Sequence, residues 1–100
     1  MDLNIENLEV IHNPAESRFE MWIEGQLSKL DYREDGNTIL MMHVGVPPEY
    51  RGHGAAGKIT QAGLEYAKEK KLRVIPMCSY VAAYIRRNPQ YIELTKHQGN

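Results

Sequence analysis

The sequence predicts a fold of the α+β (mixed α/β) class, in which a β-meander precedes a strand–loop–helix–strand unit and a short C-terminal helix. Three observations predict it. Apolar and polar residues alternate through much of the first half of the chain. The run Glu34-Asp35-Gly36-Asn37 is a hairpin signal between two of these stretches. From Ala55 onward, apolar residues recur instead at helical spacing. A chain of 100 residues has room for one domain, 1–100, with one modest core.

Four segments of the first half predict strands, because apolar and polar residues alternate in them or because apolar residues dominate. They are residues 5–11, 18–24, 27–33 and 38–46. The second segment places Phe19, Met21 and Ile23 on one face, and a tight turn around Gly25 connects it to the third. The fourth segment is the most apolar, and it is long enough for a strand that is buried on both faces.

The second half predicts two helices with one strand between them. Small and apolar residues recur at helical spacing over residues 55–71, and residues 72–77 form a short apolar strand. Residues 81–87 predict a second helix, which Asn88-Pro89 ends because the residue before a proline disfavours helical dihedral angles. Since a helix joins the last two strands, they are expected to pair in parallel.

Charge and composition exclude several classes of protein. Residues 1–50 carry ten acidic and three basic side chains, a charge of −7, whereas residues 51–100 carry nine basic and three acidic ones, a charge of +6. A basic half can serve an anionic ligand, but solvated helix faces are the alternative, and they are preferred for Lys68, Lys70 and Lys71. The chain as a whole is slightly acidic and has no recognisable nucleic-acid-binding motif, so no nucleic acid partner is expected.

The expected setting is cytoplasmic. The first residues lack the apolar run of a signal peptide, and no stretch approaches the roughly 18 apolar residues of a membrane span, so no membrane partner is expected. The single cysteine excludes an intramolecular disulfide, which fits a reducing compartment. The chain is expected to be a monomer or a weak homodimer.

The loop between the fourth strand and the first helix has the features of an anion-binding site. Unpaired N–H groups and the dipole give a helix N-terminus partial positive charge, and Gly52 and Gly54 remove side chains that would keep an anion away. Arg51 adds a full positive charge. A plain strand-to-helix turn remains the alternative. The sequence lacks a P-loop, since Gly57-Lys58 is followed by isoleucine rather than by a hydroxyl residue, and no G-x-G-x-x-G motif opens a βαβ unit.

The run from Val46 to Ala56, Val-Pro-Pro-Glu-Tyr-Arg-Gly-His-Gly-Ala-Ala, resembles the acetyl-CoA loop of the GNAT superfamily of N-acetyltransferases. That pattern is Q/R-x-x-G-x-G/A after an apolar strand, and Glu49 departs from it at the first position. Residues 43–47, and residues 76–91 with their Cys-Ser-Tyr motif, are similar to a small single-domain GNAT-like subgroup. The resemblance covers nearly the whole chain from Phe19 onward, and it implies a GNAT-like central twisted sheet.

The resemblance also implies which residues bind acetyl-CoA. Backbone N–H groups of the loop would hold the pyrophosphate, and the preceding strand would hydrogen-bond the pantetheine arm. The implied residues are Val44, Val46, Arg51, Gly52, His53, Gly54, Ala55 and Ala56. In GNAT folds the strands before the loop and after the helix splay apart, so that the acyl group and its acceptor meet in the gap. His43 and Cys78 would border that gap.

Four residues are candidates for catalysis. Histidine is a residue type suited to act as the general base that deprotonates an incoming ammonium, and His43 is the candidate, but it also fits a core histidine bound to a carbonyl. Cys78 offers either a thiolate that accepts acetyl or a thiol that lines the pocket. Tyr80 and Tyr84 each offer a general acid for the leaving thiolate, as is usual in GNAT enzymes, or a packed ring. Direct transfer in a ternary complex is favoured over a Cys78 intermediate. The scattered histidines predict no metal site.

Two functions follow. The first is an N-acetyltransferase that moves acetyl from acetyl-CoA to a primary amine, whether a small molecule or a protein. The second is a non-catalytic module that holds coenzyme A or an acyl-CoA. Residues 13–17 stand where larger GNAT enzymes have a long helical insertion, so the acceptor side is expected to be open. The acceptor itself cannot be named from these residues.

Overall fold

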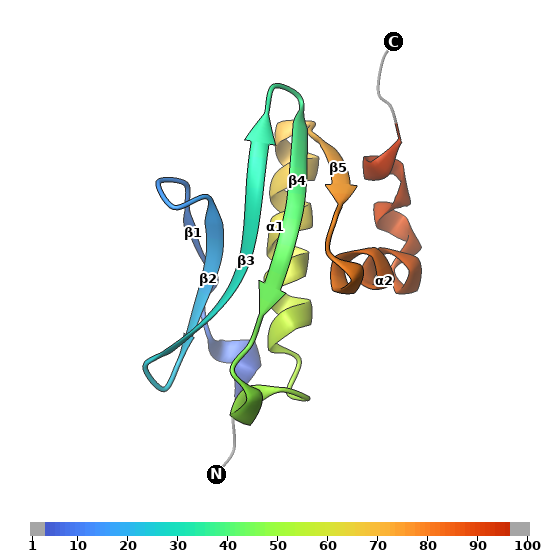
Figure 1. Cartoon of the computed structure of the whole chain (residues 1–100). Coiled ribbons are helices and arrows are strands. Elements are labelled where there is room, and N and C mark those ends of the chain that lie inside the picture. Colours follow the sequence, from blue (N-terminus) through green and yellow to red (C-terminus); the bar gives the residue numbers. More distant parts are fainter. Residues whose placement is uncertain (1–3, 97–100) are drawn as a thin grey trace.

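The computed structural model describes residues 4–96 and confirms the predicted class: a mixed five-stranded sheet packed with helices (Figure 1). Spatial order follows chain order, β1-β2-β3-β4-β5. The elements are η1 (Ile5–Asn7), β1 (Ile11–Asn13), β2 (Arg18–Ile23), β3 (Gln26–Asp35), β4 (Thr38–Gly45), η2 (Pro48–Tyr50), α1 (Ala55–Lys70), β5 (Arg73–Pro76), α2 (Ser79–Arg87) and η3 (Pro89–Thr95), where η marks a 3-10 helix.

The first four strands form the predicted antiparallel meander, and β5 pairs with β4 in parallel after α1. The β2–β3 connection has two residues, Glu24 and Gly25, with φ angles of 49° and 80°. Positive φ at both positions is the geometry of a type I′ turn, whose twist matches that of the strands it joins. Where Asp31 pairs with His43 and Tyr32 with Met41, one residue of β4, Met42, is left over as a bulge.

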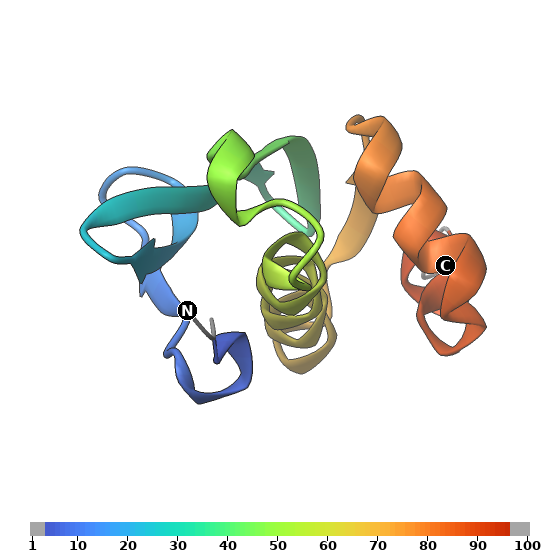
Figure 2. The same cartoon turned by 90° about the horizontal axis from the view of Figure 1, so that it is seen from below.

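Helix α1 covers one face of the sheet, and the core lies between them (Figure 2). The approach is close at Gly63, where a Cβ atom would lie 2.6 Å from Cδ2 of Leu30. On the other face, which the described elements leave open, Trp22 and Met42 are 48% and 45% exposed. The prediction that residues 38–46 are buried on both faces is therefore wrong, because no second helix layer packs there within residues 4–96.

The predicted strand over residues 5–11 is also wrong. Ile5–Asn7 forms a 3-10 turn, and the strand covers only Ile11–Asn13. The reason is a long-range contact: the Nζ group of Lys58 on α1 donates to the carbonyl oxygens of Ile5, at 3.1 Å, and Glu6, at 2.7 Å. This contact draws the segment against the helix, where the Ile5 side chain is buried, instead of along the edge of β2.

The C-terminal part differs from the prediction in extent. Helix α2 begins at Ser79, two residues earlier than expected, and ends as expected before Asn88-Pro89. The 3-10 helix after it was not predicted, and its buried residues Tyr91 and Leu94 extend the core beyond β5. Among the described residues, no helix is both long and apolar enough to cross a membrane.

Candidate cofactor and active site

The gap that the resemblance implies lies between the ends of β4 and β5. The two strands pair only from Thr38 with Arg73 to Met41 with Pro76. The backbone N–H of Cys78 then donates to the Met41 carbonyl at 3.0 Å, and the chain turns away into α2. Strand β4 continues to Gly45 paired with β3 alone. Beyond Met41, the edge of β4 that faced β5 is therefore free to hydrogen-bond another extended molecule.

The loop after β4 leads into the N-terminus of α1. Gly52 and Gly54 have φ angles of 86° and 88°, which residues with a side chain adopt only with strain. Nothing lies within 4 Å of a Cβ atom built on either glycine, so the space beside the loop is open. Gly54 is the N-cap of α1, and no side chain of residues 4–96 caps the helix there. The first N–H groups of this 16-residue helix remain available to an anion.

Arg51 is folded back onto this loop. Its Nε donates to the carbonyl oxygen of Val46 at 3.1 Å, which ties the loop to the end of β4. The residue is exposed, so its positive charge remains at the rim of the site.

A pocket of about 450 Å³ lies between the end of β4, this loop and the first turn of α2. It brings together seven of the eight residues that the resemblance implies for the cofactor, and it leaves out His53, which is exposed. Of the four catalytic candidates, only Tyr80 lines it. The lining residues are Val44, Val46, Tyr50, Arg51, Gly52, Gly54, Ala55, Ala56, Gly57 and Tyr80.

Two lining residues, Tyr50 and Gly57, are neither among the cofactor residues that the resemblance implies nor among the catalytic candidates. The sequence does contain a feature that indicates Gly57. A glycine inside a helix costs about 1 kcal/mol relative to alanine, and it often marks a place where another group packs closely against the helix backbone. A Cβ atom there would lie 3.4 Å from the hydroxyl of Tyr80. Tyr50 gave no such signal, since only the fold shows that its ring is buried beneath the loop.

The two candidate tyrosines of α2 are separated by their surroundings. The hydroxyl of Tyr80 reaches the first turn of α1 beside Gly57, and the Arg87 guanidinium lies 5.8 Å from the centre of its ring. Tyr84 instead packs toward Tyr91, with ring centres 6.3 Å apart, and it does not line the pocket. Burial raises the pKa of Tyr84, which disfavours proton donation. The geometry therefore selects Tyr80 from the pair.

His43 and Cys78 lie beside the gap between β4 and β5, but neither lines the pocket. The bulge at Met42 pairs His43 with Asp31 and turns it to the open face, away from Val44, which lines the pocket. His43 is exposed, so its interpretation as a buried core histidine is wrong. Cys78 is half-buried at the N-cap of α2, where the strands separate. The His43 imidazole thus lies on one side of β4 and the pocket on the other.

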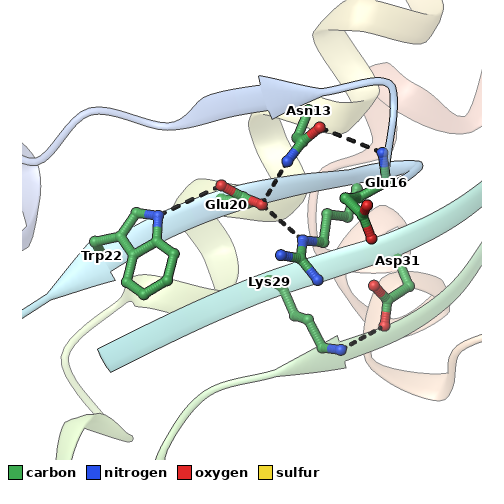
Figure 3. A network of polar contacts seen from close by, with 7 residues as sticks. Asn13, Glu16, Glu20, Trp22, Lys29 and Asp31 are labelled. Atoms are coloured by element: carbon green, nitrogen blue, oxygen red, sulfur yellow. Dashed lines mark hydrogen bonds and ion pairs between the residues drawn. The ribbon is translucent and has the colours of Figure 1, made fainter. Parts of the chain in front are cut away.

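The open face next to His43 carries a polar network (Figure 3). Glu20 accepts hydrogen bonds from Arg18 Nε at 2.6 Å, Asn13 Nδ2 at 2.9 Å and Trp22 Nε1 at 3.4 Å. The bond from Arg18, above all, lowers the pKa of Glu20. Lys29 and Asp31 form a second ion pair at 3.3 Å. Both carboxylates are paired with a basic side chain. No group of three or more His, Cys, Asp or Glu residues within 4–96 could hold a metal ion.

Three comparisons bear on this arrangement. A family model of GCN5-related N-acetyl-transferases matches residues 18–94. Protein NATD1 of Gallus gallus is 31% identical over 91 residues, which cover 86% of this chain and 83% of that protein. Protein NATD1 of Danio rerio is 30% identical over 95 residues, which cover 90% and 86%.

The architecture is shared as well. The NMR structure of a GCN5-like candidate N-acetyltransferase from Staphylococcus aureus superposes with a TM-score of 0.72 and 28% identity, over 94% of this chain and 93% of that one. The segment that the family model matches runs from β2 through the pocket loop and both α-helices into η3. The chain therefore belongs to the GCN5-related N-acetyltransferase family.

Proposed function

We propose that the protein binds acetyl-CoA in the pocket beside β4 and transfers its acetyl group directly to a primary amine that approaches from the open face of the sheet. The observation that carries the proposal is the pocket itself. It joins a glycine-rich helix N-terminus, suited to phosphate, to a strand edge that is unpaired with β5 beyond Met41.

The residues present fit the cofactor. The space left by the absent side chains of Gly52 and Gly54 admits a pyrophosphate to the N–H groups of the first turn of α1. The free edge of β4 around Val44 and Val46 suits the amide groups of an extended pantetheine chain. Acetyl-CoA would supply an acyl group on a thioester.

The proposed proton transfers need two groups on opposite sides of the gap. His43 accepts the proton that the substrate ammonium loses, which frees the nitrogen to bond to the acyl carbon. The Tyr80 hydroxyl would donate its proton to the thiolate that leaves when the carbon–sulfur bond is replaced by the new carbon–nitrogen bond. The proton that the nitrogen releases on becoming an amide restores Tyr80, directly or through water. Cys78 takes no covalent part in this route.

The non-catalytic module is the second candidate, and one observation favours it. Only Tyr80 of the four catalytic candidates lines the pocket, while His43 is exposed on the far side of β4. A protein that merely holds coenzyme A needs the loop and the strand edge but neither of these two side chains.

The two functions are separated by titration calorimetry with coenzyme A, followed by a thiol-release assay with acetyl-CoA and a panel of amines. Amine-dependent release supports the transferase, and tight binding without release supports the module. Absence of binding overturns both. In the transferase, Tyr80→Phe and His43→Gln are expected to lower the rate about 10²-fold or more, with Tyr84→Phe as the matched control.

Cys78→Ala decides the route of transfer. Direct transfer predicts that this variant still binds coenzyme A and still turns over. Complete loss of turnover, together with a trapped acetyl group on Cys78 of the wild-type protein, would contradict direct transfer.

A further inference from the structure

The β2–β3 turn is joined to the cofactor loop by side-chain hydrogen bonds across more than twenty residues of chain. The Tyr50 hydroxyl donates to Oε1 of Glu24 at 2.8 Å. Gln26 Nε2 donates to Oε2 of Glu49 at 2.9 Å and lies 3.5 Å from the Tyr50 oxygen. The hairpin therefore contacts the chain immediately before Arg51, at the end of the molecule seen in Figure 2.

Tyr50 is suited to fixing this loop because it is anchored on several sides. Its side chain is 5% exposed and its ring belongs to the pocket wall, while its hydroxyl is held by Glu24. Its backbone N–H donates to the Pro47 carbonyl at 2.9 Å within the three-residue turn η2. A single 3-10 turn is too short to set its own direction, so the position of the following residues depends on such anchors.

The presence of a glutamate at position 24 also supports a role for this turn in anchoring Tyr50. Glu24 has a φ angle of 49° at the first position of a type I′ turn, where asparagine, aspartate and glycine are the favoured residues. Glutamate is less suited to this backbone conformation, but its longer side chain reaches the Tyr50 hydroxyl. Tyrosine is protonated at neutral pH and can act as the donor, and the hydrogen bond to Glu24 raises the pKa of Tyr50 further.

We propose that Glu24 and Tyr50 are positioning residues for cofactor binding. Their hydrogen bond holds the loop over residues 51–54 in the position that directs its N–H groups toward a pyrophosphate. This inference rests on the proposed binding of coenzyme A in the pocket. Neither residue touches the reacting atoms. The loop itself is exposed from Arg51 to Gly54, and its next buried anchor is Ala55 at the start of α1.

Three variants isolate the contact. Tyr50→Phe keeps the ring in the pocket wall and removes only the hydroxyl. Glu24→Asn suits the type I′ turn better than the native residue but is too short to reach Tyr50, so any loss cannot come from a damaged turn. Glu24→Gln keeps an acceptor oxygen at the same length and is expected to restore most of the native behaviour. Tyr66→Phe is the matched control. The Tyr66 hydroxyl also donates a hydrogen bond to a glutamate, Glu34, over 2.7 Å, and this pair does not line the pocket.

The first measurement is amide hydrogen exchange of Tyr50 and Arg51 in the free protein, which needs no ligand, because their N–H groups donate to the Pro47 and Pro48 carbonyls at 2.9 and 3.3 Å and are therefore protected. Tyr50→Phe and Glu24→Asn are expected to accelerate it about tenfold, and Tyr66→Phe to leave it unchanged. The second is the affinity for coenzyme A, which is expected to fall about tenfold in both variants, with no further loss in the double variant.

The outcomes distinguish this inference from the function on which it rests. Unchanged loop exchange in Tyr50→Phe overturns the inference, whether or not the protein binds coenzyme A. Faster exchange with coenzyme A affinity within twofold of the wild type overturns the positioning role and leaves the proposed function intact. If wild-type protein does not bind coenzyme A, the proposed function fails, and with it the role of the contact in cofactor binding.

Discussion

Two glycines of α1 predict opposite results for the same substitution. At Gly57 a new Cβ atom would lie 3.4 Å from the Tyr80 hydroxyl oxygen and 3.6 Å from Cε2 of Tyr84, which is ordinary contact. At Gly63 it would lie 2.6 Å from Cδ2 of Leu30, well inside contact distance. Both positions are helical, so alanine gains about 0.5–1 kcal/mol over glycine at each from backbone entropy alone.

The magnitudes follow from these distances. Nothing opposes the gain in Gly57→Ala, so the melting temperature is expected to rise by about 4 °C for a domain of this size. In Gly63→Ala the clash falls on a side chain with no exposed surface, because Leu30 is 0% exposed. Overpacking of this kind costs about 1–3 kcal/mol, which exceeds the gain in helix propensity. The melting temperature of Gly63→Ala is expected to fall by roughly 4–8 °C.

Cofactor binding adds the decisive comparison, since Gly57 lines the pocket and Gly63 does not. Gly57→Ala is expected to be more stable than the wild type and yet to bind coenzyme A about tenfold more weakly, because its methyl group stands in the ligand's space. Thermal unfolding followed by circular dichroism, and titration calorimetry, measure the two effects. A destabilised Gly57→Ala refutes the packing argument, and a stabilised variant with native affinity refutes the assignment of the pocket.

Two further predictions concern single buried groups. The Thr60 hydroxyl is buried without a hydrogen-bond partner among residues 4–96. Thr60→Val is therefore expected to raise the unfolding free energy, measured by urea denaturation, by about 1 kcal/mol. A lower unfolding free energy in this variant would contradict the prediction. The pKa of Glu20 is lowered from 4.5, chiefly by Arg18. Ionised Glu20 therefore stabilises the folded protein above pH 4.5, and this stabilisation is lost as the pH falls through the lowered pKa. The stability gap between wild type and Glu20→Gln is expected to narrow between pH 7 and pH ~3 in thermal unfolding, and a constant gap would contradict the ion pair.

Most predictions from local signals agree with the structure, apart from the strand over residues 5–11. The meander from β2 to β4 follows from alternation, the hairpins at Gly25 and Gly36 from glycines with positive φ angles, and α1 from the helical spacing of small residues. Loop conformation at Gly52 and Gly54 depends mainly on their missing side chains. Most of the pocket was predictable for the same reason, because it is built from one continuous segment and the strand before it.

Local patterns did not predict which face of a strand or helix a residue occupies where a bulge or a contact between distant segments decides it. Strict alternation would place His43 on the same face as the buried Met41, but the bulge at Met42 reverses it. Tyr80 and Tyr84 lie one helical turn apart with ring centres at 6.4 Å, so no local pattern tells which one faces the pocket. The tertiary structure separates them, because Tyr80 lines the pocket and Tyr84 packs toward Tyr91.

By itself, the sequence determined the class of fold, the order of the main strands and helices, and an anion-binding loop at a helix N-terminus, because each depends on neighbours within a few residues. Only the tertiary structure decided that residues 5–7 turn against Lys58, that Tyr50 reaches Glu24, and that the candidate base and acid lie on opposite sides of β4. Those features join segments more than twenty residues apart or depend on a one-residue change of register, and neither leaves a periodic signal in the chain.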